Sequence, residues 1–188
     1  MRSDQIRDAS VERLIDRLDA AASLADSESI CAAVKRALVE EIGGGLRLPA
    51  ELLRPSSTGY ARHLLHRGSG YAAVVMVWGP GQGTPIHDHD GHWCVECVYQ
   101  GEIQVVSYDL TETIDEHTVV FRCEREVAAG KGMAGALIPP FDYHVIENRR
   151  DLTAVTLHIY GGEMQGCHAF VPLANGQYRK VRRQLGYS

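Results

Sequence analysis

The sequence predicts a mainly β fold, an antiparallel β-barrel or sandwich with α-helices packed outside it. Three observations predict this class: a helical periodicity that stops near residue 42, short runs of β-branched and aromatic residues after residue 58, and the lack of helical runs among them. Strands that follow one another without intervening helices pair antiparallel and close into a small barrel or sandwich.

The helical part comes first. From Val11 to about Ile42, apolar residues recur at intervals of three and four, which is the spacing of one face of an α-helix. Three glycines at 43–45 end the second helix, and the stretch "LPAELLRPSS" favours one further helical turn before Pro55. We therefore expect residues 1–54 to form a helical segment on the outside of the barrel.

The barrel is expected over residues 55–175. Its strand-like runs are bounded by glycine, proline or charged clusters, and 176–188 remain as a C-terminal tail. A chain of 188 residues fits a single domain and buries a core without help from disulfides. The runs read "YAAVVMVWG", "CVECVYQGEIQVVSYDL", "HTVVFRC" and "LTAVTLHIYGG".

Charge and composition exclude several classes. A net charge of -5 disfavours nucleic acid and anionic membranes as partners, because both attract a positive field. The first residues, "MRSDQIRDASVERLIDRL", contain no apolar leader core, and no run approaches the roughly 20 residues of a membrane span. Five irregularly spaced cysteines fit free thiols better than a disulfide framework. We expect a cytoplasmic protein, and the sequence does not indicate its oligomeric state.

Histidines indicate a metal site. His87 and His89 form an H-x-H pair, which at the end of a strand places both imidazoles on one face. A third ligand comes from elsewhere, and His144 in "ALIPPFDYHVIEN" follows a proline-containing turn that could direct it inward. Imidazole suits iron, copper, nickel and zinc alike.

A single histidine is more often a surface or structural residue than a ligand, but the spacing of these three is distinctive. The pattern resembles the paired motifs of the cupin superfamily, which are built from glycine, histidine, proline and asparagine at set intervals. Its members here are Gly81, His87, His89, Gly101, Pro139, His144 and Asn148.

One departure from that pattern is informative. Where a typical cupin has a glutamate ligand, this chain has Cys94, so the ligand set is three neutral histidines. Asp88, Asp90 and Glu96 lie nearby, but strand alternation turns Asp88 away from its two neighbours, where it is solvated or caps a turn. A divalent ion without a protein carboxylate keeps its full charge, so it attracts anions and stabilises a thiolate.

A narrower resemblance follows from six segments in a fixed order between about residues 58 and 170. Together they resemble the thiol dioxygenases of the cysteine dioxygenase type I family. The segments are "YAR" at 60–62, "WGPGQGTPIHDH" at 78–89, "CVECVYQG" at 94–101, "HVIEN" at 144–148, "TLHIY" at 156–160 and "CHAF" at 167–170.

The resemblance implies a ferrous ion, Fe(II), held by His87, His89 and His144. This ion binds the thiol substrate and activates O2 to make a sulfinic acid. The resemblance also implies that Arg62, in a Tyr-x-Arg segment with Tyr60, receives the substrate carboxylate through a bidentate pair. Without the resemblance, Arg62 would be read as an ordinary surface arginine.

The segment "TLHIY" places Thr156, His158 and Tyr160 on one face of a strand, where they could form a relay from hydroxyl to imidazole to phenol. The family has serine, histidine and tyrosine here, with the tyrosine hydroxyl near the iron. The resemblance also allows a thioether crosslink between Cys94 and Tyr160. The alternatives are that these side chains merely fill the core and that Cys94 is a small apolar residue. Cys97 faces the opposite side of its strand.

The substrate remains open between two thiols. Arg62 and Cys167 favour L-cysteine, which would become cysteine sulfinic acid, whereas "VWGPGQGTP", "HW" and "YGG" look closer to the 3-mercaptopropionate branch. We prefer L-cysteine. The rivals are a non-catalytic metal-binding cupin that acts as a sensor, which needs no relay or Arg62, and a cupin enzyme of another class. The missing ligand glutamate counts against the latter.

Overall fold

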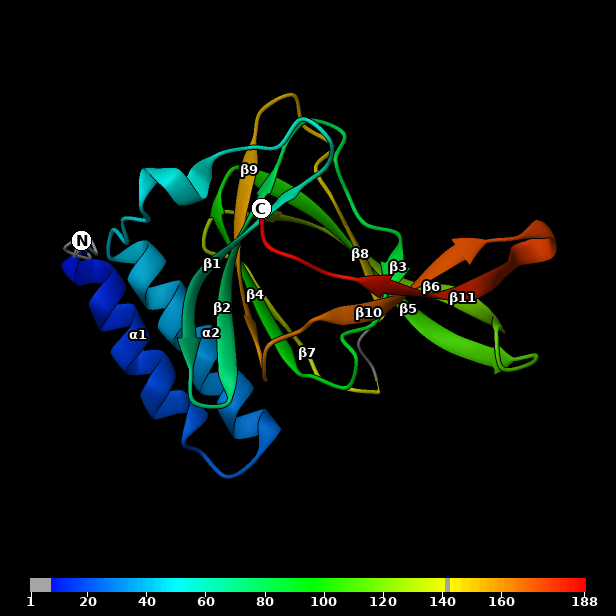
Figure 1. Ribbon diagram of the computed structural model, residues 1–188, viewed down its shortest axis with the longest axis horizontal. Coiled ribbons are helices and arrows are strands. Elements are labelled where there is room, and N and C mark those ends of the chain that lie inside the picture. The colour runs from blue at the N-terminus through cyan, green and yellow to red at the C-terminus, as the bar shows by residue number, and fades with distance from the viewer. Residues whose placement is uncertain (1–7, 141–142) are drawn as a thin grey trace.

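The computed structural model describes residues 8–140 and 143–188. Within these residues it contains two antiparallel β-sheets and two N-terminal α-helices, so the predicted mainly β cupin fold is confirmed (Figure 1). The segment that was expected to lack an apolar leader core includes residues 1–7, and these lie outside the described residues.

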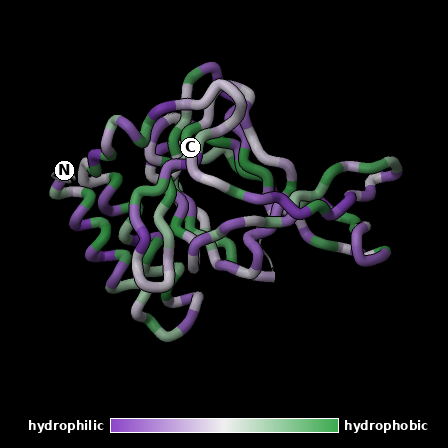
Figure 2. Tube along the Cα trace, viewed as in Figure 1, coloured by the Kyte–Doolittle hydropathy of each residue, from purple (hydrophilic) through white to green (hydrophobic). Residues whose placement is uncertain are grey.

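Helices α1 (Ala9–Ala22) and α2 (Ser27–Gly43) form the helical segment, and a 3-10 turn, Ala50–Leu53, stands where a further turn was expected. The side chains of Asp8 and Asp26 cap the two helices by accepting backbone N–H bonds from the first turns. Figure 2 shows hydrophobic and hydrophilic residues alternating along both helices. Their apolar faces pack on one sheet, which leaves the opposite face of that sheet for the barrel interior.

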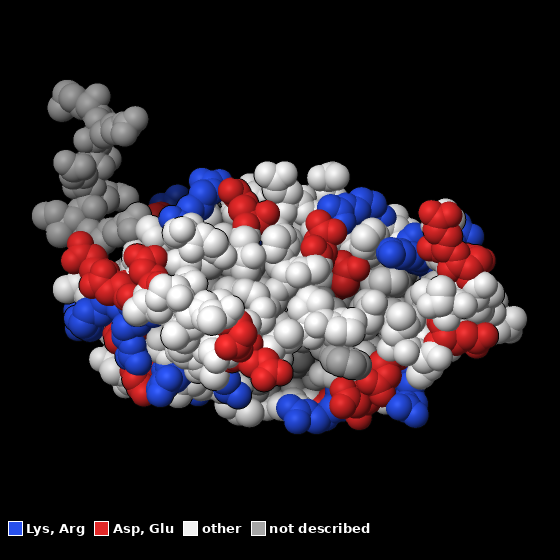
Figure 3. Space-filling view, turned by 90° about the horizontal axis from the view of Figure 1, so that it is seen from below, with Lys and Arg blue, Asp and Glu red and all other residues white. Residues whose placement is uncertain are grey.

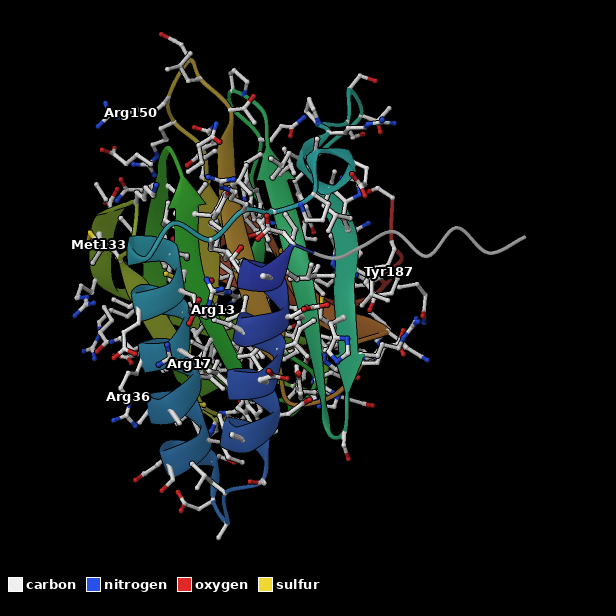
Figure 4. All side chains as sticks on the ribbon, turned by 90° about the vertical axis from the view of Figure 1, so that its left-hand side faces the viewer. Arg13, Arg17, Arg36, Met133, Arg150 and Tyr187 are labelled. Carbon is white, nitrogen blue, oxygen red and sulfur yellow. The ribbon has the colours of Figure 1, made fainter. Side chains whose placement is uncertain are left out.

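An ion-pair cluster joins the two helices on their outer side. Arg17 of α1 pairs with Glu40 and Glu41 of α2, and Arg13 also approaches Glu41 (Figure 4). These exposed pairs contribute little to stability, on the order of 0–1 kcal/mol each. The helices are therefore held mainly by the buried apolar face.

The first sheet has the strand order β1-β2-β9-β4-β7. Its central strands β2 and β9 are buried along their whole length, because helices cover one face and the barrel interior covers the other. The strands are β1 (Ala61–Gly68), β2 (Tyr71–Trp78), β4 (Cys94–Gln100), β7 (Ala134–Leu137) and β9 (Ala154–Tyr160).

The second sheet has the order β10-β11-β6-β5-β8-β3 and closes on itself, because the short β3 pairs with both β10 and β8. Two long hairpins of this sheet extend away from the helices (Figure 1). The strands are β3 (Ile86–His87), β5 (Glu102–Thr113), β6 (Thr118–Gly130), β8 (His144–Glu147), β10 (Gly166–Pro172) and β11 (Gln177–Gln184).

Strand β11 corrects the expectation of a C-terminal tail over 176–188. Most of that segment is a strand of the barrel, paired with β10 over seven positions and with β6 over three. Its side chains are charged and largely exposed, so the sequence lacks the apolar pattern that indicates a strand. Backbone pairing with its neighbours fixes the position of this strand. The barrel therefore extends past residue 175.

Two tight turns position the ends of β4. Asp90 and Gly91, with φ of 54° and 81°, reverse the chain between His89 and Cys94. At the other end Gly101 has φ of 79°, and a Cβ there would lie 3.1 Å from the Ala154 Cα. The turn before His144 contains a cis peptide between residues 139 and 140, while 141–142 lie outside the described residues.

The outer surface carries both signs of charge. On the face shown in Figure 3, acidic and basic side chains are interspersed. Neither α1 nor α2, in the part of the chain that is described, combines the length and apolarity that crossing a bilayer requires.

Candidate metal centre

Three histidines meet inside the barrel where β3 and β8 pair. His87 and His144 are cross-strand partners, and His89 follows β3 by two residues. One nitrogen from each ring lies within 4.8 Å of the other two, and the Nε2 atoms of His87 and His144 are 3.2 Å apart. The structure thus brings together the three residues that the H-x-H spacing and the later motif singled out.

These imidazoles are suited to bind a cation rather than to carry charge themselves. Burial lowers the pKa of His87 to about 3, with the neighbouring His89 adding to the effect. Burial also lowers the pKa of His144 well below its usual value. Neutral imidazoles offer lone pairs, and three such nitrogens at this spacing fit a first-row transition metal with open positions for other ligands.

A hydrogen-bonded chain runs along β9 beside the triad. The Trp78 indole N–H donates to Thr156 Oγ1 at 2.8 Å, and Thr156 Oγ1 lies 2.8 Å from His158 Nε2. The hydroxyl of Tyr160 lies 3.3 Å from His158 Nδ1 and also donates to the sulfur of Met76 at 3.7 Å. The structure thus brings Thr156, His158 and Tyr160 into contact with one another, and their action as a relay stays a prediction.

Trp78 is a member of this chain that the sequence argument did not include. Its signal was available, because it alternates with Val74 and Met76 on β2 and so faces the barrel interior. Burial raises the pKa of Tyr160 well above its usual value of 10, and the nearby Cys94 adds a smaller effect in the same direction. The phenol therefore retains its proton at neutral pH.

Arg62 is not a surface arginine. It is 5% exposed, and its Nη1 donates to the Gly186 carbonyl at 3.1 Å. Its guanidinium carbon lies 5.5 Å from the centre of the Tyr187 ring, which flanks β1 (Figure 4). Nη2 is buried without a hydrogen-bond partner among the described residues. These contacts come from 176–188, which the sequence argument set aside as a tail.

A cavity of about 270 Å³ connects these groups. The volume suits a small ligand, near the lower end of ordinary small-molecule sites. Burial raises the pKa of the Cys167 thiol in its wall to about 11. The residues in its wall that matter here are Tyr60, Arg62, His87, His158, Tyr160 and Cys167.

The remaining candidates fall into two groups. Cys94 lies directly opposite Tyr160 across β4 and β9, with its sulfur 4.0 Å from His158 Nδ1. By contrast, Cys97 packs in the core on the helical side, as alternation predicted. Asp88 accepts two bonds of 2.8 Å, from the backbone N–H and from Nδ1 of His168, and so anchors β10 beside the triad.

Glu96 is a further site residue that sequence reasoning did not assign. It follows Cys94 by two residues on β4 and therefore faces the interior, which is the signal that could have found it. Its carboxylate oxygens lie 3.8 Å from His144 Nδ1 and 3.7 Å from His158 Nδ1. Burial raises its pKa to about 8.

An antiparallel barrel that gathers three imidazoles in its interior defines a metal-binding cupin. The family model for cysteine dioxygenase type I matches residues 53–172, which is more than half of the chain. The protein therefore belongs to the cysteine dioxygenase type I family.

The chain is also similar to individual curated proteins and solved structures. "Cysteine dioxygenase type 1" from Rattus norvegicus and from Homo sapiens are each 27% identical over 113 residues, covering 59% of this chain and 55% of the relative. The chain thus spans about half the length of the curated relatives it matches. Among solved structures, an rmlc-like cupin protein from Desulfovibrio desulfuricans is 18% identical, with a TM-score of 0.45 over 63% of this chain and 97% of that one.

Proposed function

We propose that the protein is a non-haem iron(II) thiol dioxygenase that adds both atoms of O2 to the sulfur of L-cysteine, giving cysteine sulfinic acid. The observation that carries the proposal is the buried Nη2 of Arg62, which has no partner among the described residues and belongs to a side chain that shares a cavity with His87 of the triad. A buried guanidinium nitrogen without an acceptor is costly, by roughly 1–3 kcal/mol. A carboxylate-bearing substrate supplies the missing acceptor by a charge-assisted bond.

The histidines define the other end of the substrate site. His87, His89 and His144 would hold the cation, and iron(II) bound there would supply the chemistry that activates dioxygen toward the thiol. Because the three ligands are neutral, they do not offset the charge of the cation, which favours the thiolate over the thiol. The substrate thiol therefore lies at the triad while its carboxylate lies at Arg62.

Tyr160 supplies a proton-holding group between those two ends. Its hydroxyl lines the cavity and keeps its proton, because burial raises the pKa of the phenol. The chain through His158 and Thr156 fixes the orientation of that hydroxyl, since each member has a hydrogen-bond partner in the next. The phenol can thus donate a hydrogen bond to a substrate or oxygen atom in the cavity.

The register of β4 and β9 supports a Cys94–Tyr160 thioether in the active protein. Its formation joins the Cys94 sulfur to a ring carbon of Tyr160 and removes one S–H and one C–H hydrogen, and dioxygen takes up the two electrons and two protons to leave as hydrogen peroxide. The wild-type mass would then be lower by two hydrogens than the sequence predicts, and a Cys94→Ser variant would show its full mass. A crosslink that survives in Cys94→Ser and is lost in Cys97→Ser would contradict this assignment.

Oxygen uptake by ferrous-reconstituted protein tests the proposal directly. We expect uptake with L-cysteine, less with 3-mercaptopropionate, and little with cysteamine, which lacks a carboxylate. No uptake with any of the three thiols would overturn the enzyme assignment and leave a metal-binding sensor as the alternative. A higher kcat/KM for 3-mercaptopropionate would change the substrate and keep the reaction.

A paired substitution tests the role of Arg62. Arg62→Ala should raise the KM for L-cysteine by roughly 30-fold or more, because truncating one partner of a buried charge pair costs about 2–5 kcal/mol. Its iron content should stay at the wild-type level. The matched control is Arg67→Ala, also on β1 and over the same Tyr187 ring, but outside the wall of the metal cavity. Equal changes in both variants would contradict the assignment.

A further inference from the structure

Two buried polar atoms near the triad lack hydrogen-bond partners among the described residues, and they belong to side chains that approach each other. One is Nδ1 of His144, whose side chain is fully buried. The other is Oε2 of Glu96, a residue only 9% exposed. Because native structures rarely leave buried polar groups unpaired, two such atoms on neighbouring side chains call for a shared explanation.

The orientation of His144 supplies part of that explanation. Its Nε2 points to the centre of the triad, 3.2 Å from Nε2 of His87, so Nδ1 lies on the outer edge of the ring. An imidazole that binds a cation through Nε2 carries its hydrogen on Nδ1. That hydrogen needs an acceptor, and the Glu96 carboxylate, with Oε1 at 3.8 Å from Nδ1, is placed to become one.

The same carboxyl group also reaches the relay. Oε2 of Glu96 lies 3.7 Å from Nδ1 of His158, the atom that faces the Tyr160 hydroxyl. The carboxyl group therefore lies between a ring of the triad and a ring of the relay. A carboxyl accepts a hydrogen bond in either protonation state.

Glu96 lies outside the cavity in which the substrate is proposed to bind. It is absent from the wall of the metal cavity and lines a second cavity of about 110 Å³, together with Val98 and Thr156. It therefore acts on the chemistry through His144 and His158 and not by touching the substrate.

We propose that Glu96 is a positioning residue that accepts the Nδ1 hydrogen of His144, fixes the tautomer that presents Nε2 to the metal, and connects this ligand to the His158 relay. The inference rests on the proposed metal site, but it does not depend on which thiol is oxidised. Its tests therefore use metal binding, so that a failure of the proposed dioxygenase activity leaves them unaffected.

The first test compares Glu96→Leu with Glu96→Gln. Affinity for Co(II) is measured by chelator competition, with no thiol present. Loss of such a partner costs about 10–100-fold in metal affinity, which we expect for Glu96→Leu. Glu96→Gln should stay within about fivefold of the wild type, because its amide oxygen still accepts from Nδ1–H. The matched control is Val98→Ala, on the same face of β4, which should retain full affinity.

A structural role would give a different pattern. Replacing a buried carboxyl by leucine removes a desolvation cost, so Glu96→Leu should unfold at the same or higher urea concentration while binding metal more weakly. Equal affinity in Glu96→Leu and wild type, or equal loss in the Leu and Gln variants, would overturn the proposal.

A second measurement uses the native chain and so does not depend on whether a variant folds. In zinc-loaded protein with 15N-labelled histidine, the His144 hydrogen should appear on Nδ1 and exchange slowly with solvent. Observation of that hydrogen on Nε2, or rapid exchange equal to that of the exposed His117, would contradict the proposal.

Discussion

The two faces of strands β4 and β9 are buried to a similar degree but differ in chemistry. Toward the helices, Cys97 and Leu157 pack among apolar side chains. Toward the barrel interior, Cys94, His158 and Tyr160 occupy the alternate positions and make polar contacts with one another. Burial therefore does not distinguish core from site here. Core and site are distinguished by which alternate residues of each strand face the interior, since a shift of one residue would exchange the two sets.

The largest expected effect on the interior face comes from His144→Ala. Removing one of three neutral donors should lower bound iron to under about a tenth of the wild-type amount after dialysis and abolish oxygen uptake with L-cysteine. Metal analysis and an oxygen electrode provide the measurements. His92→Ala is the control, because His92 lies 2.9 Å from the Gly161 carbonyl and outside the triad. Iron retention by His144→Ala would remove His144 from the ligand set.

Tyr160→Phe should have the next largest effect. Loss of a proton-holding hydroxyl typically costs on the order of 10²–10⁴ in rate, so we expect kcat for L-cysteine to fall at least 100-fold with iron content unchanged. Tyr71→Phe is the counterpart on the helical face of the same sheet, where the phenol donates to Asp19 at 2.8 Å. Steady-state kinetics should show no loss in that control. Similar kcat values in both variants would mean that the faces do not differ as proposed.

Leu157→Ala tests the helical face for stability. Leu157 is fully buried. It stands between Thr156 and His158 in the sequence, but its side chain points to the helices. Truncation should lower the free energy of unfolding by about 2–5 kcal/mol, because it removes buried methyl groups and leaves a cavity. Urea denaturation measures this change. Oxygen uptake per folded molecule should remain near the wild-type value, and a loss of activity comparable to Tyr160→Phe would show that the faces are coupled.

The sequence was sufficient for the features that depend on local pattern. Alternation placed His158 and Tyr160 on one face of their strand and put Cys97 on the opposite side of its strand from Cys94, and the helical periodicity before residue 43 corresponds to α1 and α2. The family resemblance was sufficient to choose His144 from many histidines. Each of these inferences uses neighbours in sequence or a known motif.

The features that escaped prediction depend on contacts between distant segments. Glu96 approaches His144 only because the five-stranded sheet that contains β4 packs against the closed sheet that contains β8, which no local pattern encodes. Arg62 is buried by Gly186 and Tyr187, from a segment whose exposed charges suggested a tail. Sequence reasoning therefore recovered which residues face inward, but not which of them meet.

The smallest expected effect concerns a helix cap and its pH dependence. The Asp26 carboxylate accepts hydrogen bonds from the backbone N–H and from the hydroxyl of Ser29. Both bonds lower the pKa of Asp26, and the backbone bond has the larger effect. A carboxyl whose pKa is lower in the folded state stabilises the protein above its unfolded pKa of about 4, and this contribution is lost as pH falls through the folded value. Asp26→Asn keeps a neutral cap, so its deficit in urea midpoint should be small at pH 7 and shrink toward zero near pH 3. Because α2 packs on the helical face, the variant should oxidise L-cysteine at the wild-type rate at neutral pH. A deficit that stays constant between pH 7 and 3 would show that the charge of Asp26 does not contribute.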